Sequence, residues 1–222
     1  IEEGDLLLSV PMERAITVSS GLKRFGHILP QNAGDAEGGV HVLALELLYH
    51  TLAHPTDPWV LSLPASAQTP LAWGDAGLLA AIKASAKADQ LLQDQEQGMA
   101  AAIADLLAPV AGKFSEDGID GSSFTEKAYR HAVSLVHSRA FQVMLNDDRH
   151  LVILPFVDWL NHKDFSSRTD SAVSFDPEKM CFNVRALEKL SKGHQVFISY
   201  GRKGNAELLT GYGFCLPGNS SD

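Results

Sequence analysis

Residues 151–162, LVILPFVDWLNH, join a run of apolar and β-branched residues to a polar turn. The run over 151–157 is typical of a buried strand. The turn then places the carboxylate of Asp158, the amide of Asn161 and the imidazole of His162 at the strand exit, where loops commonly carry functional groups. By itself this turn is weak evidence for a site, because Asp158 could simply cap a short helical turn that ends at His162.

Further strand candidates lie on both sides of this stretch. The sequences around 176–178 and 191–193 are turn-like and suit reversals between short antiparallel strands. The predicted strands are residues 6–10, 172–175, 180–184 and 195–200.

The middle of the chain is predicted to be helical. A first helix is predicted from Val42 to near His54-Pro55, and alanine, leucine, glutamine and lysine dominate 78–110, which predicts one long helix or two. Residues 123–145 predict another helix, with Ser123 or Thr125 as its N-cap. A strand, then helices, then several short strands predict an α+β fold with a helical insertion.

Composition narrows the classes of partner. The 222 residues are 45% hydrophobic and 20% charged, which is typical of a packed globular fold. The formal net charge is −9 and no block is rich in lysine and arginine, so the electrostatic footprint of a nucleic-acid-binding protein is missing. No stretch approaches the roughly 18 apolar residues of a membrane span. We therefore expect a protein partner, not a nucleic acid or a membrane.

The chain has no recognisable metal-binding motif. His50 and His54 stand four positions apart, but no glutamate lies between them in the His-Glu-x-x-His pattern and no third ligand is evident. The pair is better explained as imidazoles placed favourably at a helix end. We expect no metal site.

Two further groups of residues could carry chemistry. Arg139, in the sequence Ser-Arg-Ala-Phe over 138–141, could serve as an ion-pair partner or as an anion clamp. Downstream, Tyr200-Gly201 ends a predicted strand, and Asn205 is a plausible N-cap of a helix that breaks at Gly211 before Tyr-Gly-Phe. Each group alone has an ordinary structural explanation.

The order of these motifs is more informative than any one of them. Ser-Arg-x-Phe, a strand, Asp-x-x-Asn-His, a strand ending in Tyr-Gly, Asn-x-Glu-Leu-Leu and Tyr-Gly-Phe follow one another in this chain. This pattern resembles SET-domain protein-lysine methyltransferases of the Rubisco large-subunit methyltransferase-like branch. Residues 3–11 resemble the strand after that family's first motif. Residues 63–64 and 70–73, with the helices after them, resemble its helical insert. The resemblance covers essentially the whole chain.

The resemblance implies a specific architecture. The expected fold is α+β, with small antiparallel sheets, a pseudoknot-like C-terminal segment and a helical insert. Residues 1–37 would be the N-terminal part of the SET domain, 38–146 the insert and 147–222 the C-terminal part with the catalytic motifs.

The resemblance also implies the cofactor S-adenosylmethionine and a role for each motif residue. Asn161 and His162 would hold the adenine and amino-acid portions of the cofactor, largely through backbone groups. Arg139 would lie near the cofactor carboxylate, Phe214 would pack against the adenine, and Asp158 would brace the Asn-His turn.

The resemblance likewise implies how the target amine is handled. Tyr200 matches the family's active-site tyrosine beside the cofactor, and Tyr212 would line the lysine channel opposite it. A lysine amine, with a pKa of about 10.4 in solution, must arrive neutral and in line with the methyl group, which burial between aromatic walls favours. The expected partner is thus a protein that presents a lysine.

Several points stay open at this stage. The family's Gly-x-Gly strand is absent and the chain opens inside a strand at Ile1, so we expect the sequence to be an excerpt of a longer polypeptide. The alternative is a catalytically silent SET-like scaffold subunit of a larger assembly, for example in a plastid.

A further family tyrosine appears here as Val173 or a neighbour, which bears on the number of methyl groups added. A related animal branch modifies histidine. Plant family members suggest the chloroplast, otherwise the cytoplasm or nucleus.

Overall fold

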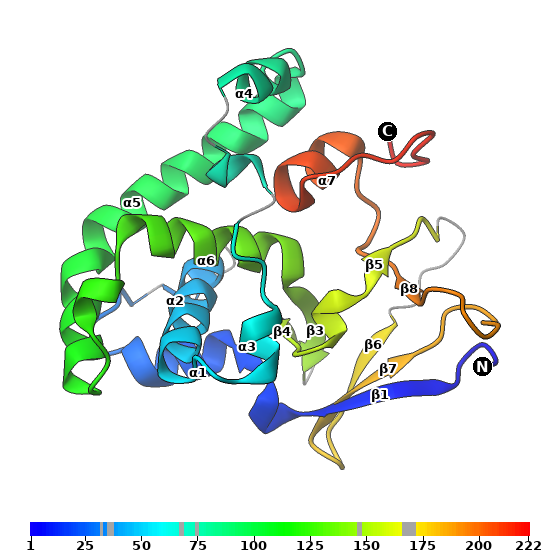
Figure 1. Ribbon diagram of the computed structural model, residues 1–222, viewed down its shortest axis with the longest axis horizontal. Helices are drawn as coiled ribbons and strands as arrows, with labels where there is room; N and C mark the ends of the chain where they lie inside the picture. The colour runs from blue at the N-terminus through cyan, green and yellow to red at the C-terminus, as the bar shows by residue number, and fades with distance from the viewer. Residues whose placement is uncertain (32, 35–37, 67–68, 74–75, 146–147, 166–171) are drawn as a thin grey trace.

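The computed structural model describes the chain except residues 32, 35–37, 67–68, 74–75, 146–147 and 166–171 (Figure 1). Most of the helices gather on one side of the molecule and the strands on the other. The helices are α1 (Val18–Phe25), α2 (Gly38–Ala53), α3 (Pro58–Ser62), α4 (Ala76–Ile82), α5 (Ala86–Glu116), α6 (Glu126–Arg139) and α7 (Asn205–Tyr212). The 3-10 turns are η1 (Met12–Arg14), η2 (Pro70–Ala72), η3 (Gly121–Ser123) and η4 (Val157–Trp159). The strands are β1 (Leu6–Pro11), β2 (Ile16–Thr17), β3 (Phe141–Leu145), β4 (Asp148–Ile153), β5 (Asn161–His162), β6 (Val173–Asp176), β7 (Cys181–Arg185) and β8 (Phe197–Ile198).

The strands form three small sheets, with the orders β1-β7-β6, β2-β4-β3 and β5-β8. The first two are antiparallel, with Val10 opposite Phe182 and Ile16 opposite Ile153. The third departs from the predicted antiparallel pattern, because β5 and β8 run parallel. The chain reaches β8 only after the long β6–β7 excursion, and parallel strands need such a connection. The α+β class with small sheets is confirmed.

Most predicted strands are present, with shifted ends. The turn at 176–178 joins β6 to β7 as predicted, whereas the turn at 191–193 lies between strands of different sheets. The strand predicted over 151–157 ends at Ile153, so a turn separates it from Asp158. The last predicted strand shrinks to β8.

The helical predictions hold except at one boundary. Residues 78–110 fall in two helices, α4 and α5, and Thr125 caps α6 through its side chain. The prediction that this helix runs to residue 145 is wrong. Ala140 is extended, and Phe141–Leu145 pairs with β4 in a sheet, so strand pairing overrides local helix propensity there. Strand β3 therefore lies inside the range 38–146 predicted to be the insert.

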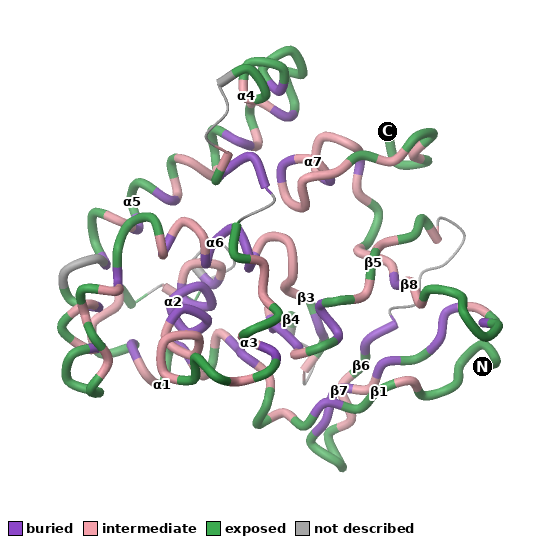
Figure 2. Tube along the Cα trace, in the orientation of Figure 1, coloured by how far each residue is buried: buried purple, intermediate pink, exposed green. Residues whose placement is uncertain are grey.

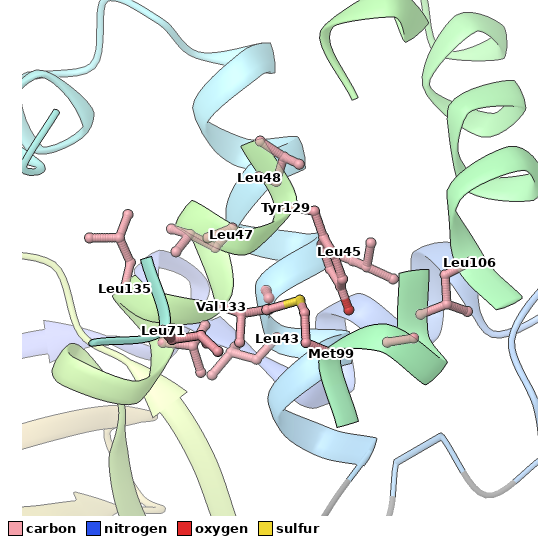
Figure 3. Packing of buried hydrophobic residues seen from close by; sticks show 14 of the residues in the cluster. Leu43, Leu45, Leu47, Leu48, Leu71, Met99, Leu106, Tyr129, Val133 and Leu135 are labelled. Carbon is pink, nitrogen blue, oxygen red and sulfur yellow. The ribbon is translucent and has the colours of Figure 1, made fainter. Parts of the chain in front are cut away.

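The two largest of the three hydrophobic clusters in the described structure hold the molecule together. The larger, which we call the helical cluster, joins α2, α5 and α6, and Figure 3 shows Leu43, Met99 and Val133 directed into one space. Residues 42–48 of α2 are all buried, and Figure 2 shows this stretch in purple. The smaller, the sheet cluster, includes Val152 of β4, Val157 of η4 and Phe182 of β7. The polar turn after Val157 is thus anchored by packing on its N-terminal side.

The C-terminal segment lies against the loops that follow β5 and β8. The Ser220 hydroxyl donates to the Asp164 carboxylate (2.7 Å), and the Asn219 amide donates to the Lys203 carbonyl (2.9 Å). The pseudoknot stays a prediction, because these contacts show only that the segment rests on those loops. Of the described helices, none is long and apolar enough to cross a membrane.

Candidate functional site

The pairing of β5 with β8 brings the Asn-His turn to Tyr200. His162 lies opposite Ile198, and Tyr200 follows two residues later. The Tyr200 backbone N–H donates to His162 Nδ1 (3.1 Å), and the Tyr200 hydroxyl donates to the Leu160 carbonyl (2.7 Å). These bonds fix both ends of the tyrosine against the turn.

Four rings form what we call the site stack: His162, Tyr200, Tyr212 and Phe214. Tyr200 lies nearly parallel to His162 (centroids 5.1 Å apart, 21°) and to Tyr212 (4.8 Å, 23°). Phe214 closes the group at 6.3 Å from both His162 and Tyr212. Helix α7 ends at Tyr212, with Gly213 in the left-handed region (φ 81°), so the chain turns and both aromatic side chains reach the stack.

Two sequence predictions about this helix are wrong. The break predicted at Gly211 comes two residues later, at Gly213. Asn205 is the first helical residue and not the N-cap, a position that Gly204 takes. The Asn205 side chain instead bridges to Leu216, accepting from its N–H (2.7 Å) and donating to its carbonyl (2.9 Å). Asn205 therefore ties the start of α7 to the segment after Phe214.

Arg139 and Asp158 form a buried ion pair beside the site stack. Arg139 Nη1 donates to Asp158 Oδ2 (2.6 Å) and to the Asp158 carbonyl (3.1 Å). The indole N–H of Trp59 donates to Asp158 Oδ1 (3.0 Å), so both carboxylate oxygens have partners and the side chain is fully buried. The hypothesis that Asp158 caps a helical turn is wrong, because the N-cap of η4 is Phe156 and no side chain caps it.

The pKa values follow from burial. Burial raises the pKa of Asp158, against the opposing effect of the Arg139 charge. Burial also raises the pKa of Tyr200 to about 12 and raises that of Tyr212. Burial lowers the pKa of His162. Near neutral pH both phenols therefore keep their protons and His162 is neutral, in accord with Nδ1 accepting the Tyr200 N–H.

Two cavities meet at these residues. The larger has a volume of about 640 Å³ and the smaller about 470 Å³. Phe214 and Asn161 line only the smaller one, whereas Phe141, Phe165 and Lys203 line only the larger one. The residues that line both are Ser138, Arg139, Asp158, Tyr200 and Tyr212. Two ligands could thus reach the same tyrosines and ion pair.

The structure brings the predicted site residues close together around the site stack and the two cavities, and adds others. Trp59, Phe165 and Lys203 were not predicted, and only Trp59 gave a signal: a buried indole needs an acceptor for its N–H. Val173, at or near which the resemblance places a further tyrosine of the family, is buried in the sheet cluster and is not among the described residues that line either cavity.

Comparison with curated proteins finds methyltransferases. No protein-family model matches the chain. The ribosomal lysine N-methyltransferase set10 of Schizosaccharomyces pombe is 38% identical over 102 residues, which is 45% of this chain and 18% of that protein. The actin-histidine N-methyltransferase of Danio rerio is 28% identical over 100% of this chain and 37% of its own length. The N-lysine methyltransferase setd6 of Danio rerio is 24% identical over 98% and 49%. The chain spans less than half of each of these relatives.

Solved structures show the same fold. The SET domain of LSMT bound to lysine and AdoHcy superposes with a TM-score of 0.72 at 20% identity, over 98% of this chain and 49% of that one. Rubisco LSMT bound to AdoMet gives a TM-score of 0.68 over 98% and 48%. At this identity the likeness shows a common fold.

Proposed function

We propose that this chain, which has the fold of the SET domain of Rubisco LSMT, transfers a methyl group from S-adenosylmethionine to the side-chain amine of a lysine in a protein substrate. The observation that carries the proposal is the meeting of two cavities at Tyr200, Tyr212 and the Arg139–Asp158 pair. One cavity suits the methyl donor and the other suits the acceptor.

The residues around the smaller cavity fit the cofactor. Phe214 offers an aromatic face for adenine, and Asn161 offers amide and backbone groups. Arg139 makes both of its bonds to Asp158 through Nη1, and a guanidinium has five N–H donors, so it can also bind a carboxylate. A volume of about 470 Å³ is within the range of cofactor cavities. When bound there, S-adenosylmethionine supplies a methyl group on a positively charged sulfur.

The residues around the larger cavity can hold a neutral amine. The Tyr200 hydroxyl donates a hydrogen bond to the Leu160 carbonyl. The lone pairs of the hydroxyl oxygen can therefore accept a hydrogen bond from the amine. Tyr212 and Phe141 add aromatic walls that exclude water. Such surroundings lower the pKa of a lysine amine, and a fixed amine position supplies much of the rate enhancement.

Lysine is the acceptor we propose, with histidine as the competing residue. The relatives at 38% identity are ribosomal lysine methyltransferases by name, and they match 45% of the chain. Relatives that match the whole chain at 28–29% identity are named as actin-histidine methyltransferases. The identity of the methylated residue therefore has to be read from the product.

The test is a transfer assay with S-adenosylmethionine labelled on its methyl group. The purified protein would be offered peptide mixtures rich in lysine or in histidine, and the acid-hydrolysed product would be analysed for methylated amino acids. We expect labelled methyl-lysine, and its loss in the double variant Asn161→Ala/His162→Ala. Label only in methyl-histidine would change the acceptor. A folded protein that binds the cofactor but transfers no label would favour the silent scaffold.

We also propose a chloroplast location and membership of a larger protein assembly. The support for both is the resemblance to plant members of the branch. Microscopy of the fluorescently tagged protein and gel filtration of native extracts would test them.

A further inference from the structure

We propose that Trp59 is a positioning residue for the candidate site: its indole N–H orients the Asp158 carboxylate and, through it, the Arg139 guanidinium. This inference rests on the proposed function, because the pair that Trp59 holds borders both the donor and the acceptor cavity. Trp59 lies 99 positions away from Asp158 in the sequence, in the predicted insert.

Helix α3 and turn η4 are joined by two hydrogen bonds, each donated by a tryptophan of one element to a side chain of the other. Trp59 of α3 donates to Asp158 of η4 (3.0 Å), and Trp159 of η4 donates to the Ser62 hydroxyl of α3 (3.1 Å). The first bond is buried and the second is exposed. The Asp57 carboxylate caps α3 by accepting a hydrogen bond from the backbone N–H of Trp59 (2.8 Å). This bond fixes the backbone from which the buried indole projects.

Turn η4 needs such support because its backbone entry is unfavourable. Phe156, which precedes it, has φ 69°, a left-handed conformation that residues with a Cβ seldom adopt. No side chain caps η4, and the ring of Phe156 meets only the edge of Trp159 at 5.1 Å, with both rings half in solvent. Within the described structure, the turn is therefore held through Asp158 from two sides, by the buried bond from Trp59 and by the two bonds from Arg139.

The same bond helps to keep Asp158 charged. Burial favours the protonated acid, and the opposing groups are Arg139 from α6, then Trp59 from α3 and the backbone of Phe156. The other titratable group that faces the carboxylate is the phenol of Tyr200, which stays protonated below about pH 12. Without the indole N–H, Oδ1 would lose its side-chain partner, so Asp158 would take up a proton at higher pH and release Arg139.

The test is binding of S-adenosylmethionine by calorimetry between pH 5.5 and 9, for the parent and Trp59→Phe. We expect affinity to fall about tenfold near neutral pH, as for loss of a hydrogen bond to a charged group, and the acid limb of the affinity profile to move to higher pH. Trp73→Phe is the matched control: Trp73 packs on the same helical cluster and lines neither cavity, so its profile should not move.

A double-mutant cycle with Asp158→Leu, which leaves the indole N–H no acceptor at this position, separates positioning from general loss of structure. If Trp59 acts through the carboxylate, Trp59→Phe should cost less than twofold in the Asp158→Leu background. An equal loss in both backgrounds, or an unshifted acid limb, would overturn the inference. Should Trp59→Phe fail to fold, 3-benzothienylalanine at position 59 keeps the shape and removes the N–H. A folded parent that binds no cofactor overturns the proposed function itself; a parent that binds, with an unchanged variant, overturns this inference alone.

Discussion

The molecule contains two aromatic groups that use similar residues in different ways. In the helical cluster, Phe114 meets Tyr49 and Phe124 edge to face, at 5.5 Å and 74° and at 5.3 Å and 62°. In the site stack, Tyr200 lies nearly parallel to His162 and Tyr212, at 21° and 23°. Phe114 is completely buried, whereas the residues of the site stack are all partly exposed.

The difference in geometry separates stability from binding. An edge-to-face ring places its edge against its neighbour's face, so such a group fills space in several directions and leaves no cavity. Parallel rings leave a flat wall, and Tyr200 and Tyr212 form such a wall beside both cavities. The helical cluster should therefore carry folding free energy, and the site stack should carry affinity and rate.

The largest expected effect is on folding. Phe114→Ala should lower the free energy of unfolding by about 4 kcal/mol, because it opens a cavity in a fully packed region. Urea titration would measure the change, and cofactor affinity at a temperature where the variant is folded should match the parent. A loss of less than about 1 kcal/mol would contradict the statement that the helical cluster carries folding free energy.

The next effect is on the pH dependence of stability. Burial, with a smaller effect of His41, lowers the pKa of His137 from 6.5 to about 4. The unfolded chain then binds the proton more tightly, so stability present above pH 6.5 is lost as the pH falls towards 4, by about 3 kcal/mol. Urea titrations of the parent and His137→Gln across this range should show a shallower slope in the variant. An identical slope would contradict the account.

The third effect is on rate. Tyr200→Phe removes the hydroxyl that would orient the amine, so methyl transfer should fall by about a hundredfold. The free energy of unfolding should change by only about 1 kcal/mol, the usual contribution of one hydrogen bond. Tyr129→Phe is the matched control, since its buried hydroxyl bonds to His41 (2.9 Å) in the helical cluster. That variant should lose stability and keep its transfer rate; the reverse pattern would refute the division of roles.

The smallest effect concerns the surface link between the two regions. Lys87 of α5 pairs with Glu207 of α7 at 3.4 Å, and both side chains are exposed. Lys87→Ala should change the free energy of unfolding by less than about 0.5 kcal/mol, because water and salt screen such pairs. A change above about 1 kcal/mol in urea titration would show that α7 is held by this ion pair and not by its apolar contacts.

The sequence indicated which residues lie together at the candidate site, but not what holds them there. Asp158, Asn161 and His162 all lie within residues 158–162. This short motif, followed later in the chain by Tyr200, could therefore be recognised without any knowledge of packing. The bond from Trp59 to Asp158 joins residues 99 positions apart and leaves no local pattern. The sequence also placed Arg139 beside a ligand carboxylate, whereas the structure shows it bound first to Asp158.

The missed elements share a physical cause. Residues 141–145 continue a helical pattern locally, and only pairing with β4 makes them a strand. Strand β5 is two residues long, too short for any periodicity, and exists because it pairs with β8, the two residues that remain of the strand predicted over 195–200. Where a segment's conformation depends on a partner far along the chain, local propensity does not determine it.

The most direct test of the central claim is calorimetric binding of S-adenosylmethionine by the parent, Phe214→Ala and Phe165→Ala. Phe214 lines only the smaller cavity and Phe165 only the larger one. If the smaller cavity holds the cofactor, the parent binds, Phe214→Ala binds at least about tenfold more weakly, as for loss of an aromatic contact with the adenine, and Phe165→Ala binds like the parent. A folded parent that does not bind, or equal losses in the two variants, would contradict the account.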